Sequence, residues 1–534
     1  MKTIPAAAGV VADRSLVGTA LAAAYTAEID AWLGSVIDDV GDVPGFALAA
    51  VGGYGRGDLS PGSDLDLLLI HQFEGSAAEV AERIWYPIWD TGMKLGHAVR
   101  TIDEALNLAS GDLDTATSLL QVRSLGGSQA LVDELQRKAL DQWRENADRM
   151  LDQLDVRIRE RHEQAGELAF LLEPDLKLSQ GGLRDLHCLQ WIDLADPSLL
   201  EDSEREALDG PHGVLLSARI ELHRATGRAN NQLLLQEQDE VADALGYGDA
   251  DRLMAAVAEA ARTVTGIEDA VLHRTHKRGR RRRWLARTRD LGHGILLAEE
   301  TLTLAEDAPV SDPVMPLRVA VHAAREDAFI FRDVLDRIAA EGAPLPNPWP
   351  DEARELFVDL LLMGHDMIRV VEALDQVDLV TRLIPEWAPN RHRPQRNAYH
   401  RFTVDRHLLE AAAEAARLVD RVERPDLLVL GGLFHDIGKG YPGDHSEVGV
   451  GLVHTIAERM GYPPTDIEIL EALVRHHLLL PDVASRRDLE DEGTVKLVAD
   501  AVPSTGTIEL LAALTEADSI ATSKSAWNSW KAGL

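Results

Sequence analysis

The stretch GGYGRGDLSPGSDLDLLLI, residues 52–70, decides the fold of the N-terminal part of the chain. It opens with closely spaced glycines, passes through a polar turn and ends in an apolar run typical of a buried strand. Asp64 and Asp66 stand one residue apart where that strand is predicted to begin. Because side chains alternate across a strand, both carboxylates are expected on the same face. Buried strands rarely carry two carboxylates at one end, so the pair predicts a functional site.

The sequence around this stretch predicts a small α/β domain. FALAAVGG (46–53) is predicted to form the preceding strand, and KLGHAVRT (94–101) the following one. AAEVAERIWYPIWDTG (77–92) has the pattern of a helix, and residues 1–40 are also predicted to be helical. Strands with an intervening helix indicate an α/β domain that extends to about residue 130.

The rest of the chain predicts helices almost throughout. Long amphipathic segments follow one another from residue 131 to about 340. The proline-rich segment GAPLPNPWPDEA (342–353) predicts a domain boundary, and the pattern beyond it is helical to the end. We therefore expect a multidomain, mainly α protein with domains at 1–130, 131–345 and 346–534.

Composition limits the function classes. The chain has 534 residues and a formal net charge of −35, which opposes broad binding to nucleic acid. The basic run HKRGRRRRW (276–284) is interpreted as a solvated helix face or a contact for an acidic neighbouring domain. Cys188 is the single cysteine, so no disulfide within the chain is possible. No signal peptide or long apolar run is evident, which predicts a cytoplasmic protein without membrane or nucleic-acid partners.

Asp64 and Asp66 have the chemistry of a metal site for phosphate transfer. Hard carboxylate oxygens suit Mg²⁺, and the glycines let the backbone approach a triphosphate closely. This pattern resembles the nucleotidyltransferase superfamily that includes polymerase beta, which implies two catalytic, metal-binding aspartates. The predicted nucleotide-binding residues are Gly52, Gly53, Arg56 and Ser63.

The resemblance also implies a third carboxylate, usually from a later strand. The strand predicted at 94–101 offers His97 instead, and Asp103 and Glu104 lie beyond it. The third acid therefore stays unassigned.

A second site is predicted in LVLGGLFHDIGKGYPGDHSEVG (428–449), which contains a His-Asp doublet. Imidazole and carboxylate groups together suit a divalent metal that polarises water. The doublet and the histidines around it resemble the HD phosphohydrolase superfamily. The resemblance implies a metal site, Mg²⁺, Mn²⁺ or another divalent ion, formed by His407, His435, Asp436 and Asp518, with His435 and Asp436 catalytic. His400 is a weaker competitor of His407. A second ion or a phosphate is expected at His445 and at His476 or His477.

The order of the two sites resembles the bifunctional PII uridylyltransferase/uridylyl-removing enzyme family. Further similar segments are LLEPDLKLSQGGLRDLHCLQWI (171–192), 222–247, 383–407 and 514–534. The resemblance implies a polymerase-beta-type nucleotidyltransferase domain, a helical middle domain and an all-α HD domain. It implies that the first half moves UMP from UTP to the PII protein and that the HD half removes it. Actinobacterial relatives use ATP and attach AMP, and no assigned residue chooses between the bases.

The same resemblance implies two C-terminal ACT domains that sense glutamine. The sequence ends at Leu534 directly after the HD segment, so we expect this sensor pair to be absent from these residues. Either a piece of a longer protein or a naturally short member fits.

Two residues of the 171–192 segment have open roles. Arg184 and Asp185 are expected either to contact the nucleotide or the transferase domain, or to form an internal salt bridge. Cys188 is interpreted as inert packing.

Three alternative functions fit the sequence less well. A guanosine tetraphosphate synthetase/hydrolase also pairs these domains, but its HD domain comes first. A tRNA-nucleotide-adding enzyme is expected to carry a basic surface, contrary to the net charge. A non-catalytic regulatory scaffold is disfavoured by the intact Asp-x-Asp and His-Asp pairs.

Overall fold

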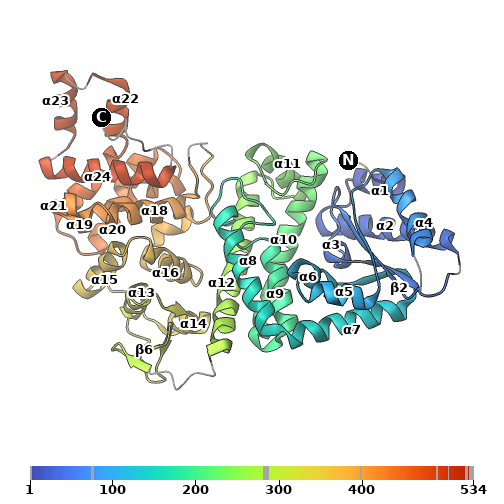
Figure 1. Cartoon of the computed structure of the whole chain (residues 1–534). Coiled ribbons are helices and arrows are strands. Elements are labelled where there is room, and N and C mark those ends of the chain that lie inside the picture. The colour runs from blue at the N-terminus through green and yellow to red at the C-terminus, as the bar shows by residue number, and fades with distance from the viewer. Residues whose placement is uncertain are drawn as a thin grey trace. The chain divides into compact units, whose positions relative to one another are not determined.

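The computed structural model (Figure 1) describes residues 3–41, 43–73, 77–280, 288–396, 400–488, 491–502, 504–523 and 527. The chain divides into two compact units, Met1–Arg282 and Arg283–Leu534. Among the described residues, no single helix is long and apolar enough to cross a bilayer. Helices α23 (Glu492–Ala501) and α24 (Thr505–Thr522) together reach that length and composition, but the chain bends by 97° between them.

A four-stranded sheet organises the start of the first unit. Its order is β3-β2-β1-β4, with β2 antiparallel to β1 and parallel to β3. The strands are β1 (Phe46–Ala50), β2 (Leu65–His71), β3 (Leu95–Arg100) and β4 (Arg123–Gly127). The three predicted strands are thus confirmed. Strand β4, antiparallel to β1, was not predicted separately.

The glycine segment differs from the prediction. Strand β1 ends at Ala50, and Gly52–Gly55 forms the short helix α3 instead of continuing the strand. Gly52 has φ +58, a conformation that favours glycine and turns the chain away from the sheet. The turn brings the glycines to the end of the sheet where β2 begins, because Val51 N–H donates to Asp66 O.

Apolar helix faces cover this sheet. Ile29 and Leu33 of α2 (Gly18–Val40) and Ile84 of α4 (Ala78–Thr91) share a core with Leu67 and Leu69 of β2. Both helices were predicted. The remaining short helices of this part are α1 (Pro5–Ala12), α5 (Ile102–Ala109) and α6 (Leu113–Leu119).

Long helices form the rest of the first unit, as the amphipathic pattern predicts (Figure 1). They are α7 (Gln129–Glu145), α8 (Ala147–Ala165), α9 (Leu183–Ala195), α10 (Asp202–Thr226), α11 (Leu235–Leu245) and α12 (Ala250–Arg280). The 3-10 helix η1 (Pro197–Leu199) links α9 to α10. Helix α12 includes the start of the basic run 276–284, where the His276 ring lies 3.2 Å from Asp155. Residues 281–284 of that run lie outside the described residues.

The second unit opens with a sheet that the helical pattern did not predict. Its order is β5-β6-β7-β8, with strands β5 (Thr288–Asp290), β6 (Ile295–Ala298), β7 (Thr301–Leu304) and β8 (Phe329–Ile330). These strands have two to four residues, too few for an alternating pattern to stand out in the sequence. The expectation of helices up to about residue 340 is therefore wrong for this segment.

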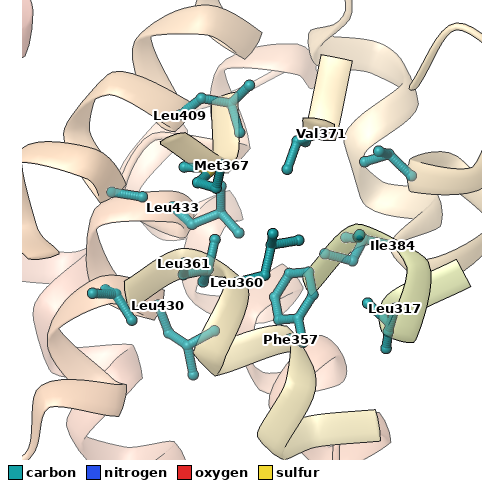
Figure 2. Close-up of a cluster of buried hydrophobic side chains, with 14 of the residues drawn as sticks. Leu317, Phe357, Leu360, Leu361, Met367, Val371, Ile384, Leu409, Leu430 and Leu433 are labelled. Carbon is teal, nitrogen blue, oxygen red and sulfur yellow. The ribbon is translucent and has the colours of Figure 1, made fainter. Parts of the chain in front are cut away.

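Helices make up the remainder of the second unit. They are α13 (Met315–Arg325), α14 (Arg332–Glu341), α15 (Asp351–Leu362), α16 (Asp366–Asp375), α17 (Leu379–Leu383), α18 (Val404–Ala416), α19 (Pro425–Phe434), α20 (His445–Arg459), α21 (Pro464–His476) and α22 (Leu479–Arg486), followed by α23 and α24. Short 3-10 helices are η2 (Pro385–Asn390), η3 (Val419–Arg421) and η4 (Ile437–Gly440). Figure 2 shows Phe357 and Leu360 of α15 in one apolar cluster with Leu409 of α18 and Leu433 of α19.

This core extends across the predicted domain boundary. Ile330 and Leu335 precede the proline-rich segment 342–353, and they belong to the same core as Phe357 and Leu433. The segment therefore links α14 to α15 within one compact unit and does not separate two units. The finer division into three domains stays a prediction.

Two candidate active sites

The first site is a cavity of about 550 Å³ at the start of β2. Its size lies within the range of roughly 300–1,000 Å³ typical of small-molecule pockets. All six residues predicted for the transferase site line it: Gly52, Gly53, Arg56, Ser63, Asp64 and Asp66. The fold thus brings the whole predicted set together.

The two aspartates occupy different environments. Asp64 directly precedes β2, and about half of its side chain is exposed; Lys94 Nζ lies 3.7 Å from its Oδ1. Asp66 is the second residue of β2 and is partly buried. Burial, and then the nearby charge of Asp64, raises the pKa of Asp66. A cation between the two carboxylates would relieve this repulsion.

Strand β3 brings no acid to this site. It places Gly96 opposite Asp66, and the His97 ring packs against Trp85 and Trp89. Glu104 closes a capping box with Thr101 at the start of α5. The acids that line the cavity besides the predicted pair are Asp58 and Asp114.

The helical segment supplies another part of the cavity wall. Lys177, Arg184 and Arg219 line it, together with His187 and Trp191. Sequence reasoning considered Arg184 and missed the other four: Lys177, His187 and Trp191 lie in the same 171–192 segment but form no pattern with a known chemistry, and Arg219 is distant in the chain.

Arg184 and Asp185, whose roles the sequence left open, have different surroundings in the structure. Arg184 reaches the cavity. Asp185 is fully buried and pairs with Arg161, and it accepts the Gly181 N–H at 2.6 Å. Cys188 is buried, and burial raises the pKa of its thiol to about 11, which fits the interpretation as inert packing.

The second site gathers the predicted HD residues in the second unit. His407 of α18 and His435 at the end of α19 approach within 3.2 Å through their Nε2 atoms. Asp518 of α24 lies 3.1 Å from His407 Nε2 and 3.4 Å from His435 Nε2. Asp436 Oδ2 lies 3.4 Å from His435 Nε2, so all four predicted ligands converge. The His400 ring centroid is 5.3 Å from that of His407, and His400 is outside the candidate ligand groups.

A second group of candidate metal ligands lies around Oδ1, the other carboxylate oxygen of Asp436. His445 Nε2 and His477 Nε2 lie 3.6 and 3.5 Å from Asp436 Oδ1. His477 is buried and follows the last residue of α21, whereas the neighbouring His476 belongs to no candidate ligand group. Of the two histidines left open by the sequence, the structure brings His477 to Asp436.

The donor set fits divalent metal ions. Asp436 Oδ1 is buried and has no hydrogen-bond partner, although buried polar atoms are normally satisfied. Burial acts to lower the pKa of His435, but Asp436 and Asp518 outweigh it and raise that pKa to about 10. The carboxylates thus stabilise positive charge at the point where the imidazoles converge. Lys439 Nζ, 2.5 Å from Asp436 Oδ2, adds a fixed cation beside the site.

Comparison with known proteins finds one family match in each of the two units. Residues 145–272 match the model of the GlnD PII-uridylyltransferase family, and residues 404–520 match that of the HD domain. The bifunctional uridylyltransferase/uridylyl-removing enzyme of Corynebacterium glutamicum is 35% identical over 505 residues, which cover 94% of this chain and 71% of that protein. The chain belongs to the bifunctional uridylyltransferase/uridylyl-removing enzyme family.

Two other members of this family are more similar in sequence. The enzyme of Streptomyces coelicolor is 46% identical over 95% of this chain and 62% of its own length. The enzyme of Mycobacterium tuberculosis is 42% identical over 95% of this chain and 64% of its own length. The chain therefore spans somewhat less than two thirds of the length of these two relatives.

Proposed function

We propose that this chain transfers UMP or AMP from UTP or ATP to the PII protein in the first unit and removes it hydrolytically in the second. The observation that carries the proposal is the presence of two donor sets in one chain: Asp64 with Asp66, and the four converging HD residues. The names of the relatives and of the matching family support the same pair of activities. Consumption of a nucleoside triphosphate supports a cytoplasmic location.

In the proposed transfer reaction, Asp64 and Asp66 would hold Mg²⁺. When bound, such an ion neutralises phosphate charge and lowers the pKa of an attacking hydroxyl. Gly52 and Gly53 let the chain backbone approach the phosphates without a side chain in the way, and Arg56 contributes a fixed charge. The attacking oxygen is that of a PII tyrosine, and pyrophosphate leaves.

We assign the third carboxylate of this site to Asp114. It lines the cavity from the first turn of α6, and it forms no ion pair within 4.0 Å among the residues described. Asp58, the other candidate, is engaged by Arg56 at 3.1 Å. Asp114 is thus the acid of the cavity that remains available to a ligand.

In the proposed removal reaction, His407, His435, Asp436 and Asp518 would hold one divalent ion, Mg²⁺ or Mn²⁺. His445 and His477 would hold a second ion on the other oxygen of Asp436. Such ions, when bound, activate water for attack on a phosphodiester. Lys439 is placed to neutralise the charge of the phosphate beside Asp436.

The test is the intact mass of folded PII from the same organism after incubation with this chain, Mg²⁺ and either UTP or ATP. A UMP or AMP increment would establish the transfer and identify the nucleotide. Re-incubation of the purified product without nucleotide, and with Mn²⁺, should restore the original mass. No increment with either nucleotide, and no loss from chemically confirmed PII-UMP or PII-AMP, would contradict the proposal.

A further inference from the structure

Three cations of the helical segment share the cavity with Asp64 and Asp66. Lys177 lies in the loop before α9, Arg184 in the first turn of α9, and Arg219 on α10. They come from outside the predicted transferase domain at residues 1–130. The cavity therefore has a metal-binding wall from the sheet and a cationic wall from the helices.

Hydrogen bonds fix the chain segments that carry the three cations, and one of them orients the Arg219 side chain. Arg184 N–H donates to Lys177 O at 2.9 Å, which keeps these two residues side by side. Asn231 Oδ1 accepts the Arg219 Nε hydrogen at 2.8 Å, and Asn231 O accepts the N–H of Leu176 at 2.9 Å. The loop that carries Lys177 is thus tied to the residue that orients Arg219. A prearranged group of donors loses little conformational entropy when it binds a ligand.

Carboxylates act on the three cations only from a distance, Asp175 on Lys177 and Arg219, Asp114 on Arg184 and Asp58 on Arg219, and none forms a direct ion pair with them. Within the described residues, none of Lys177, Arg184 and Arg219 has a carboxylate oxygen within 4.0 Å. The partner of Arg219 is a neutral amide, and the Arg184 guanidinium lies 5.8 Å from the Trp191 ring centroid. Arg56 differs, because Asp58 pairs with it.

Burial destabilises the charged forms of these side chains when no anion is bound. Burial, together with the charges of Arg184 and Arg219, lowers the pKa of Lys177 to about 8. Burial also lowers the pKa of Arg219 to about 10. Mutually repelling cations in a partly buried cavity are stabilised when an anion binds among them.

We infer that Lys177, Arg184 and Arg219 bind the polyphosphate of the nucleoside triphosphate, so that the helical segment completes the nucleotide site. This inference rests on the proposed function, since it names the residues that hold the substrate of the first site. A triphosphate fits better than a singly charged group, because three separate cations face one cavity that also has a carboxylate pair suited to Mg²⁺. An acidic segment of a protein is the competing ligand class.

The test uses inorganic tripolyphosphate with Mg²⁺ as the probe and the full chain as the receptor. Calorimetric titration should give at least tenfold weaker binding for Lys177→Gln and for Arg219→Gln than for the unmodified chain. Arg137→Gln is the matched control, because its exposed guanidinium pairs with Asp141 on α7 outside the cavity. Unchanged affinity in both cavity variants, or no binding by the unmodified chain, would overturn the inference.

A second measurement avoids variants that fail to fold. Acetic anhydride at limiting concentration labels lysines of the unmodified chain, and mass spectrometry gives the rate at each position. Mg²⁺-tripolyphosphate should slow the labelling of Lys177 at least fivefold and leave unchanged that of Lys138, a half-buried lysine of α7 that pairs with Glu134 outside the cavity. Equal labelling with and without the probe would overturn the inference, as would protection by an acidic peptide but not by tripolyphosphate.

Rates of PII modification, compared with tripolyphosphate binding, distinguish a failure of this inference from a failure of the proposed function. Modification of PII at normal rates by Lys177→Gln and Arg219→Gln would reject the inference alone. Tripolyphosphate binding that depends on both residues, combined with no transfer to PII by the unmodified chain, would reject the proposed substrate and keep the phosphate site.

Discussion

Gly96 of β3 lies directly opposite Asp66 of β2, and a β-carbon at Gly96 would stand 2.4 Å from Asp66 Oδ1. The φ angle of Gly96 is not positive, so the glycine is required by the close approach and not by the backbone conformation. The carboxylate of Asp66 thus occupies the space that a side chain on the neighbouring strand would fill.

Gly96→Ala should therefore displace the Asp66 carboxylate and lower the transfer rate at least tenfold. Removal of the nucleotide from modified PII should stay unchanged, because the HD residues lie in the second unit. Gly111→Ala is the control, since nothing lies within 4 Å of a β-carbon there. Rates of both reactions, measured by intact mass of PII, check the prediction; equal transfer rates in the two variants would contradict it.

Asp114→Asn should reduce the transfer rate at least tenfold if Asp114 is the third acid of the cavity. Asp103→Asn offers a close match, because Asp103 and Asp114 each occupy the second position of a helix, in α5 and α6 respectively. Both substitutions remove one negative charge from a helix N-terminus at a comparable small cost. A loss of transfer of the same size in both variants would assign the effect to the helices and not to the cavity.

His477→Gln should lower the hydrolytic rate at least tenfold and reduce the bound metal, whereas His476→Gln should change neither by more than twofold. The reason is that His477 Nε2 lies 3.5 Å from Asp436 Oδ1, while the adjacent His476 belongs to no candidate ligand group. Elemental analysis of the purified variants gives the metal content, and mass loss from modified PII gives the rate. If His476→Gln had the larger effect, the assignment of the second group would be wrong.

The sequence predicted the two motif-based sites and missed what distant segments add to them. Asp64 and Asp66 stand one residue apart and His435 and Asp436 are adjacent, so each pair could be recognised as a motif and compared with known families. Lys177 in the loop before α9 and Arg219 on α10 are 42 residues apart in the chain, and only packing brings them to one cavity. The choice between His476 and His477 depended on where α21 ends, since neighbouring helical residues diverge by about 100°. The strands β5–β8 were not predicted, because each is too short to show an alternation of polar and apolar residues.

Glu268 of α12 should make the stability of the chain depend on pH. Its carboxylate is fully buried, neither oxygen has a hydrogen-bond partner, and His162 Nε2 lies 3.6 Å from Oε2. Burial raises the pKa of Glu268 from 4.5 to about 8, although Arg161 opposes the shift. The folded chain therefore keeps a proton that the unfolded chain loses above pH 4.5.

This difference in proton binding determines whether the free energy of unfolding rises or falls with pH. Between pH 4.5 and about 8 the folded state binds one more proton at this site, so the free energy of unfolding falls as the pH rises, by about 1.4 kcal/mol per unit. Glu268→Gln removes the titrating group with little change in shape. Its stability relative to the unmodified chain should thus increase by about 2 kcal/mol between pH 6 and 7.5.

Urea unfolding of the first unit's helices at pH 6, 6.5, 7 and 7.5, followed by circular dichroism, measures this difference. Glu259→Gln, an exposed substitution on the same helix, should show no pH-dependent change relative to the unmodified chain. A stability difference for Glu268→Gln that is constant across these four pH values would mean that Glu268 stays ionised in the folded chain, with Arg161 or His162 compensating its charge.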